Sequence, residues 1–224
     1  MTDIWKEEPV IILGDTYKLF GILRDADSEK LIVFSPWVNG DRTGLSRIYV
    51  EAARALLTKG ISSLCIDMPP NGYSYDSNYD ELKYIENYGK YLEKTIQYLM
   101  DNFQYKEYII IGFCSSAIPA IYVSRKYHHK KVLCLNPYDF IDVDHGAQAY
   151  EVFHDYFRYY SNKIDILYIL SEKEENASRK REYLEKHFED DNCNIKVEIL
   201  LNTSHTYDGW FTKKKVIDTI INWI

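Results

Sequence analysis

Short runs of strand-favouring residues alternate along this sequence with longer segments of helical periodicity. The run Tyr-Ile-Ile-Ile at 108–111 is typical, because strands buried on both faces of a parallel sheet are short and continuously apolar. Strands that alternate with helices predict an α/β fold, with a mostly parallel central sheet covered by helices on both faces. We predict strands at 9–24 (two, around Gly14), 31–36, 61–67, 108–111, 131–135, 164–170 and 195–201, and helices at 45–59, 80–103, from about 115, 177–188 and 213–224.

The length and the charge of the chain narrow its class. A chain of 224 residues without an internal repeat or a Pro/Gly-rich linker is expected to form one domain over 1–224. The formal net charge of −7 at pH 7 argues against a nucleic-acid partner, since proteins that bind phosphate backbones usually carry a basic face. No apolar run approaches the roughly 20 residues that cross a bilayer, and the first residues lack a secretory signal pattern. We therefore expect no membrane span and a cytoplasmic protein.

The four cysteines show no spacing typical of a metal site. No CxxC pair and no paired histidine accompany them, so we predict no metal and no cofactor. Disulfides are not expected in a reducing compartment. Cys65 and Cys134 lie inside apolar runs, where cysteine commonly serves as a small core residue. Cys114 differs from both, because it follows an apolar run and precedes small residues.

Three short motifs follow predicted strands, at the positions where parallel sheets bind ligands. The first is Gly112-Phe113-Cys114-Ser115-Ser116, in which small residues permit a tight turn from a strand into a helix. The second is the loop at 67–74, which reads Asp-Met-Pro-Pro-Asn-Gly-Tyr-Ser. The third is Asn-Thr-Ser-His at 202–205, between the last predicted strand and the last predicted helix.

These motifs resemble those of the α/β-hydrolase superfamily, and the resemblance covers nearly the whole chain. Residues 112–116 look like its nucleophile elbow, G-x-S-x-G, with Cys114 as nucleophile, as in hydrolases similar to dienelactone hydrolase, and with Ser116 replacing the second glycine. The loop at 67–74 is similar to the superfamily's D-x-P-G-x-G-x-S, with Pro70 where the first glycine is usual. Gly-Phe-Cys-Ser-Ser-Ala also resembles, over a short stretch, the G-x-C-x-G-A of hydrolases associated with bacterial exopolysaccharide and exosortase systems. The resemblance implies the α/β-hydrolase fold with a small or minimal cap.

The chain order of nucleophile, acid and histidine in this superfamily assigns the catalytic roles. Cys114 would be the nucleophile, and His205 the base that holds it as a thiolate. The acid would follow the next-to-last predicted strand, where Glu174 has the best register. Glu175 beside it, and Asp139 after the preceding strand, are the alternatives. The competing interpretation of the run Glu-Lys-Glu-Glu is a solvated charge cluster.

The resemblance also assigns the groups that would surround the substrate. Two backbone N–H groups, those of Ser115 and Trp37, would hold the oxyanion. The segment 137–162 has the length of a short cap-like insertion and is rich in aromatic residues. If it caps the site, Trp37, Tyr138 and Phe140 would line an apolar substrate pocket. The alternatives are that this segment packs on the body of the protein or forms a homodimer interface.

Together these features predict a hydrolase or acyltransferase with a Cys-His-acid triad and a covalent acyl-cysteine intermediate. The substrate would be a small ester or thioester, either free or bound to a carrier. The alternative function is a non-catalytic α/β-hydrolase-like binding module, in which Cys114 is a structural thiol and His205 a surface histidine. Ser115 and Ser116 flank the apex of the turn, so we expect them to serve the start of the helix.

Overall fold

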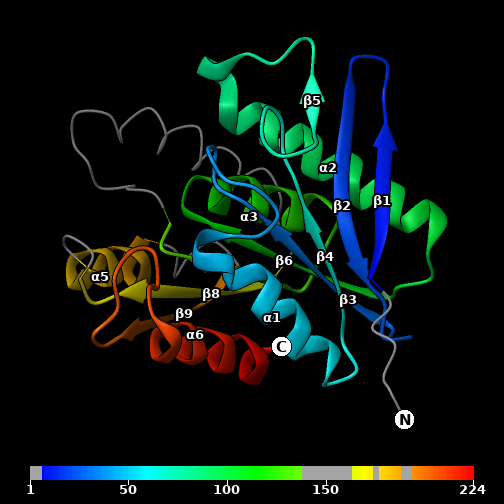
Figure 1. Ribbon diagram of the computed structural model, residues 1–224. Helices are drawn as coiled ribbons and strands as arrows, with labels where there is room; N and C mark the ends of the chain where they lie inside the picture. The colour runs from blue at the N-terminus through cyan, green and yellow to red at the C-terminus, as the bar shows by residue number, and fades with distance from the viewer. Residues whose placement is uncertain (1–6, 138–162, 174–176, 188–192) are drawn as a thin grey trace.

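The computed structural model describes residues 7–137, 163–173, 177–187 and 193–224. In this part of the chain the strands form one sheet in the order β1-β2-β4-β3-β6-β7-β8-β9, with β5 paired to β2 (Figure 1). β1 pairs with β2 and β2 with β4 in antiparallel fashion, and from β4 to β9 all neighbours are parallel. The strands are β1 (Glu7–Leu13), β2 (Tyr17–Arg24), β3 (Lys30–Ser35), β4 (Ser62–Ile66), β5 (Tyr75–Asp76), β6 (Glu107–Phe113), β7 (Lys131–Leu135), β8 (Ile164–Ser171) and β9 (Cys193–Leu200).

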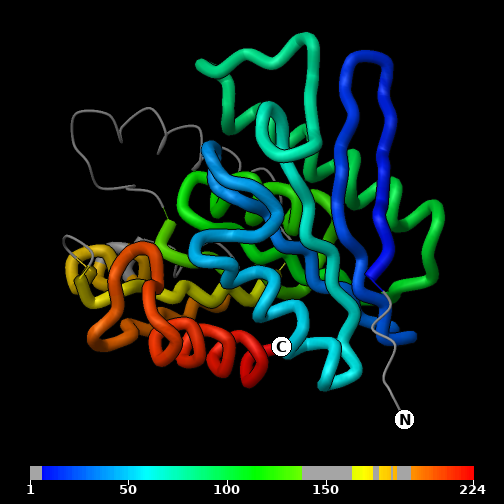
Figure 2. Tube along the Cα trace, in the orientation of Figure 1, coloured from blue at the N-terminus to red at the C-terminus, as the bar shows by residue number. Residues whose placement is uncertain are grey.

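The helices cover both faces of the sheet. Figure 2 shows α1 and α6 side by side on the near face, with α2 and α3 beyond the sheet. Each long helix from α1 to α3 is preceded directly by a short 3₁₀ turn. The helices are α1 (Ile48–Leu57), α2 (Tyr84–Asn102), α3 (Ala117–Lys126), α5 (Ala177–His187) and α6 (Trp210–Trp223), and the 3₁₀ turns are η1 (Leu45–Arg47), η2 (Glu81–Lys83) and η3 (Cys114–Ser116).

Both faces of the central strands are buried, and this explains their continuous apolar sequence. In β3, Leu31 and Val33 pack into the core beneath α2 and α3, while Ile32 and Phe34 pack into the core beneath α1 and α6. Successive side chains of a strand point to opposite faces, so a strand between two helical layers needs apolar residues at every position. Each such burial stabilises the fold by about 1.5–3 kcal/mol.

The strands and helices predicted from the sequence are all present, with ends shifted by a few residues. The helix predicted at 45–59 begins later, at Ile48, because Ser46 and Arg47 have left-handed φ angles of 50° and 64°. The Ser46 hydroxyl instead donates a hydrogen bond to Asp208, at 2.9 Å. The two-residue strand β5 was not predicted, since only its pairing with β2 makes it a strand.

Two further predictions concern a membrane-spanning helix and a cap over the site. Among the described residues no helix combines the length and the apolar character that crossing a bilayer requires. The cap-like insertion predicted at about 137–162 lies outside the described residues, apart from Pro137.

His129 is a buried histidine at the edge of the sheet where the parallel strands begin. Its side chain is 7% exposed, and its ring stacks on Tyr108 with ring centres 5.5 Å apart. Among the described residues its Nδ1 has no hydrogen-bond partner. Burial lowers the pKa of His129 to about 4, and the neighbouring His128 contributes to the shift.

We predict that His129 makes the protein less stable as the pH falls from about 6.5 to about 4. In this window the histidine is protonated in the unfolded chain, whose pKa is near 6.5, but neutral in the fold. The free energy of unfolding is unaffected by this group above pH 6.5, and acidification to pH 4 lowers it by about 2–3 kcal/mol. Urea unfolding at several pH values measures this loss. The variant His129→Phe keeps the stacked ring without the titration, so its unfolding free energy should depend less on pH over this window. Equal pH dependence in the two proteins would contradict the prediction.

Candidate active site

The loops after the parallel strands bring those predicted site residues that the structure describes to one edge of the sheet. The parallel strands from β3 to β9 all end at this edge. Trp37 follows β3, Asp67 follows β4, Cys114 follows β6 and His205 lies beyond β9. Open α/β sheets bind their ligands at this edge, so these groups are where substrate chemistry would be expected.

Cys114 lies at the apex of a sharp turn between β6 and α3. Its φ angle is 52°, in the left-handed region that residues with a side chain rarely adopt, and its side chain is half-buried. Gly112 makes the turn possible, because a Cβ there would lie 2.6 Å from the Ser116 carbonyl oxygen and 2.8 Å from the Ala117 Cα. The strand and the helix therefore approach too closely for any side chain at position 112, and the turn presents the thiol at the edge of the sheet.

Two serines beside Cys114 hold this turn in place. The Ser116 hydroxyl accepts a hydrogen bond from the Phe113 N–H at 2.8 Å and lies 2.8 Å from the Ser35 carbonyl oxygen, to which it donates. It thus serves the helix start, as expected, and also links the ends of β3 and β6. Ser115 was expected to do the same, but its hydroxyl accepts from the Val38 N–H at 2.9 Å and so holds the loop after β3.

The loop after β3 is held close to the elbow by further contacts. The Val38 carbonyl oxygen accepts hydrogen bonds from Asn71 Nδ2 at 2.6 Å and from the Tyr88 hydroxyl at 3.0 Å. The Trp37 ring meets the Phe113 ring edge to face, with centres 5.7 Å apart. In the part of the chain that the structure describes, the Trp37 N–H donates to no acceptor, whereas the Val38 N–H is already used by Ser115.

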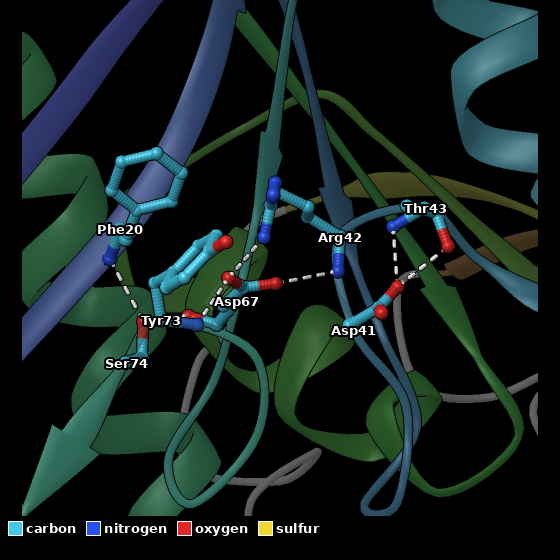
Figure 3. Close-up of polar contacts among 7 residues, drawn as sticks. All are labelled: Phe20, Asp41, Arg42, Thr43, Asp67, Tyr73 and Ser74. Carbon is cyan, nitrogen blue, oxygen red and sulfur yellow. Dashed lines mark hydrogen bonds and ion pairs between the residues drawn. The ribbon is translucent and has the colours of Figure 1, made fainter.

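Asp67 joins the loop after β3 to the loop after β4 (Figure 3). Its carboxylate is fully buried and accepts hydrogen bonds from the Arg42 N–H at 2.7 Å and the Tyr73 N–H at 2.9 Å. It also pairs with the Arg42 guanidinium at 2.7 Å. Gly72 is needed beside it, because a Cβ at that position would lie 2.2 Å from the carboxylate. A buried charge is tolerated when it is paired and hydrogen-bonded in this way.

The Arg42 guanidinium also lies over two aromatic rings. Its central carbon is 5.0 Å from the ring centre of Phe20 and 5.0 Å from that of Tyr73, contacts at which a cation is attracted to a ring face. Ser74 extends the same cluster, since its hydroxyl accepts from the Phe20 N–H and donates to the Asp67 carbonyl oxygen (Figure 3). The loop at 67–74 therefore supports the edge of the sheet, and its partner Arg42 had no signal in the sequence.

His205 lies next to the elbow. Its ring contacts the Phe113 ring edge to face, with centres 5.3 Å apart, and Phe113 immediately precedes Cys114. The imidazole is half-buried. Tyr207 anchors the loop that carries His205 to β8, because its buried hydroxyl donates to the Ile169 carbonyl oxygen of that strand at 2.9 Å. The structure thus brings the third sequence motif to the first, although 91 residues separate His205 from Cys114 in the chain, that is, 205 − 114.

Tyr49 lies beneath the elbow and stays protonated. Its hydroxyl donates to the Ser35 carbonyl oxygen at 2.8 Å. Burial raises the pKa of Tyr49 well above its usual value of 10, and the neighbouring thiols of Cys65 and Cys114 raise it further. This phenol therefore cannot serve as a base for the thiol at neutral pH.

The predicted acids lie outside the described residues, but the chain that leads to Glu174 is described. Glu174, Glu175 and Asp139 are not among the described residues, and neither are the predicted pocket residues Tyr138 and Phe140. After β8, the Lys173 N–H donates to the Thr203 carbonyl oxygen at 3.1 Å. The segment before Glu174 therefore runs beside the loop that carries His205.

Comparisons with solved structures identify this architecture. A dienelactone hydrolase from Anabaena variabilis superposes with a TM-score of 0.75 over 98% of this chain and 96% of its own, at 15% identity. The esterase PF2001 from Pyrococcus furiosus gives 0.72 over 97% and 91%, at 18% identity. An alpha-beta serine hydrolase homologue from Coxiella burnetii gives 0.70 over 100% and 98%, at 12% identity. This chain has the α/β-hydrolase fold.

Comparisons of the sequence itself identify no family for this chain. No family model matches the chain, and no curated protein matches it significantly. At identities of 12–18% the likeness to the solved structures establishes the fold, as the motifs in the sequence predicted.

We predict that Asp67→Asn destabilises the protein by about 2–4 kcal/mol. The change removes the negative partner of a buried ion pair, which typically costs about 3–5 kcal/mol, and Arg42 keeps a 21% exposed side chain that water can partly solvate. Urea unfolding measures the difference. Asp41→Asn is the matched control, since Asp41 lies beside Arg42 in the loop after β3 and caps Thr43, a role that asparagine also fills. A cost for Asp67→Asn no larger than that of the control would contradict the prediction.

Proposed function

We propose that this protein is a hydrolase or acyltransferase that acts on an ester or thioester through a covalent acyl-cysteine at Cys114. The observation that carries the proposal is a half-buried thiol at the apex of a left-handed turn, with the His205 ring beside the preceding residue. A histidine beside a cysteine can act as the base that removes the thiol proton and so activates the sulfur as a nucleophile. The solved structures with the same fold include a dienelactone hydrolase and an esterase, which supports an acyl substrate.

The first half of the reaction would form the acyl-enzyme. The Cys114 thiolate attacks the carbonyl carbon of the substrate, and the carbonyl oxygen becomes an oxyanion. The N–H groups of Ser115 and Trp37 would bind this oxyanion, and the absence of a described acceptor for the Trp37 N–H supports its part in that role. The tetrahedral intermediate then expels the alcohol or thiol, which takes a proton from the His205 imidazolium.

The second half would release the acyl group. His205 removes a proton from water, or from the hydroxyl or thiol of another acceptor, as its oxygen or sulfur attacks the acyl carbon. Cys114 leaves as the thiolate, the product is an acid, a new ester or a new thioester according to the acceptor, and the imidazolium is again paired with sulfur. Glu174 is our choice for the carboxylate that orients the imidazole, with Glu175 and Asp139 as alternatives. The course of the chain after β8, beside the His205 loop, supports Glu174.

The expected acyl group is apolar or aromatic. Trp37 lies at the elbow, and its ring packs on Phe113. Tyr138 and Phe140 would extend this surface from the cap-like segment. We place the protein in the cytoplasm, because a cysteine nucleophile must stay reduced. The acyl group could arrive on a small molecule or on a carrier.

We predict that a small activated ester, p-nitrophenyl acetate, acylates Cys114 and no other cysteine. Peptide mass analysis after a short incubation locates the adduct. Cys114→Ala should abolish the adduct and lower turnover at least about 1000-fold, and His205→Ala should lower turnover about 100-fold or more, since it removes the base. Cys193→Ala is the matched control, because Cys193 is the other half-buried cysteine among the described residues and lies at the start of β9.

Adducts on Cys193 as readily as on Cys114, or turnover that survives Cys114→Ala, would refute the acyl-cysteine mechanism. An unreactive Cys114 toward esters and thioesters would indicate the non-catalytic binding module instead.

A further inference from the structure

A buried asparagine at the end of β7 contacts the backbone of the loop that carries His205. Asn136 directly follows Leu135, is fully buried, and has a φ angle of 38°. Asparagine tolerates this left-handed region better than most residues, because its short side chain bonds the nearby backbone. Its Nδ2 group donates to the His205 carbonyl oxygen at 2.8 Å and to the Ser171 hydroxyl at 2.7 Å. Both amide hydrogens are therefore used.

The same side chain also fixes the end of β8. Asn136 Oδ1 accepts from the Ser171 N–H at 2.7 Å, and the Asn136 N–H donates to the Ile169 carbonyl oxygen at 2.9 Å. The Ser171 hydroxyl in turn donates to the Ser204 carbonyl oxygen at 2.6 Å. One buried amide thus holds two successive carbonyl groups of the histidine loop, one directly and one through a serine.

The chemistry at position 136 requires an amide and not only a side chain of that size. The His205 carbonyl oxygen and the Ser171 hydroxyl oxygen present two acceptors, and the Ser171 N–H presents one donor. A primary amide supplies the matching two donors and one acceptor. A carboxylate of equal size would face the His205 carbonyl oxygen with a negative oxygen. Buried and fully satisfied polar groups of this kind rigidify what they connect.

We propose that Asn136 is the positioning residue of the histidine in the acyl-transfer site. It holds the backbone at residues 204 and 205 against the ends of β7 and β8, which sets the imidazole against Phe113 and toward the elbow. Asn136 acts through His205, because its amide binds the backbone of the His205 loop and the side chain of Ser171. This inference rests on the proposed function, since positioning matters only if His205 transfers protons. Misplacing a catalytic group by about 1 Å can cost about 100-fold in rate.

The test compares Asn136→Asp with Asn202→Asp in the hydrolysis of p-nitrophenyl acetate. Asn202 lies in the same loop, is exposed, and takes the same chemical change, so it controls for the added charge. We expect Asn136→Asp to lower kcat about 10- to 100-fold with KM changed less than about threefold, because the acyl binding surface is intact. The control should keep the wild-type kcat. Ser171→Ala removes the link to Ser204 and one acceptor of the Asn136 amide but keeps the direct bond from Asn136 to the His205 carbonyl oxygen, so it should lower kcat by a smaller factor.

Urea unfolding and histidine-ring NMR signals separate positioning from loss of structure. The variants are compared at a denaturant-free condition where each is more than nine-tenths folded, and the ring signal of His205 is assigned by its disappearance in His205→Gln. We expect that signal to shift in Asn136→Asp and not in Asn202→Asp. If Asn136→Asp does not fold, the kcat and the His205 ring signal of Ser171→Ala test the proposal instead.

The outcomes distinguish this inference from the function on which it rests. Wild-type turnover that needs Cys114 and His205, together with an unchanged kcat in both Asn136→Asp and Ser171→Ala, would overturn the positioning role and leave the function standing. A fall in kcat matched by an equal loss of folded protein would overturn it as well. Absence of turnover and of any Cys114 adduct in the wild-type protein would overturn both.

Discussion

Backbone hydrogen bonding between parallel strands sets where the loops that carry the described site residues begin. The pairing of β3 with β6 sets Ser35 opposite Gly112, and the pairing of β6 with β7 sets Phe113 opposite Leu135. The strands are buried on both faces, so a one-residue shift of register would turn each side chain to the opposite helical layer and disrupt the packing of both. Because the register is fixed, the loops that follow these strands begin side by side at one edge. Cys114 and the loop that carries His205 therefore lie at the same edge, with the His205 ring against Phe113, although they come from distant parts of the chain.

Buried polar side chains then hold these loops in one arrangement. Asp67 links the loops after β3 and β4, Ser116 links the ends of β3 and β6, and Asn136 links β7, β8 and the His205 loop. Burying a polar group costs free energy unless its hydrogen bonds are made, and in these three places they are made. Such networks are costly to disturb, and they give a site a fixed geometry before any substrate binds.

The elbow concentrates backbone strain at the residue that would do the chemistry. A left-handed φ at a residue with a side chain costs about 1–3 kcal/mol, and such residues cluster at functional sites. The strain at Cys114 is held by the close packing of Gly112 on the first turns of α3 and by the Ser116 hydroxyl. The result is a half-buried thiol at the rim of the core, unlike Cys65 and Cys134, which are buried within strands. Burial raises the pKa of Cys65 to about 12, so that thiol stays neutral.

The sequence by itself determined the order of strands and helices and the sharp turn at Cys114. These follow from local chemistry: apolar periodicity defines the elements, and a glycine beside a small side chain permits the turn. Only the tertiary structure decided which loops support the site. Arg42 meets Asp67 across 25 residues and Asn136 meets His205 across 69, and no spacing in the chain marks either pair. Such contacts arise when separate loops are brought to the same edge of the sheet, so they depend on the packing of the whole fold.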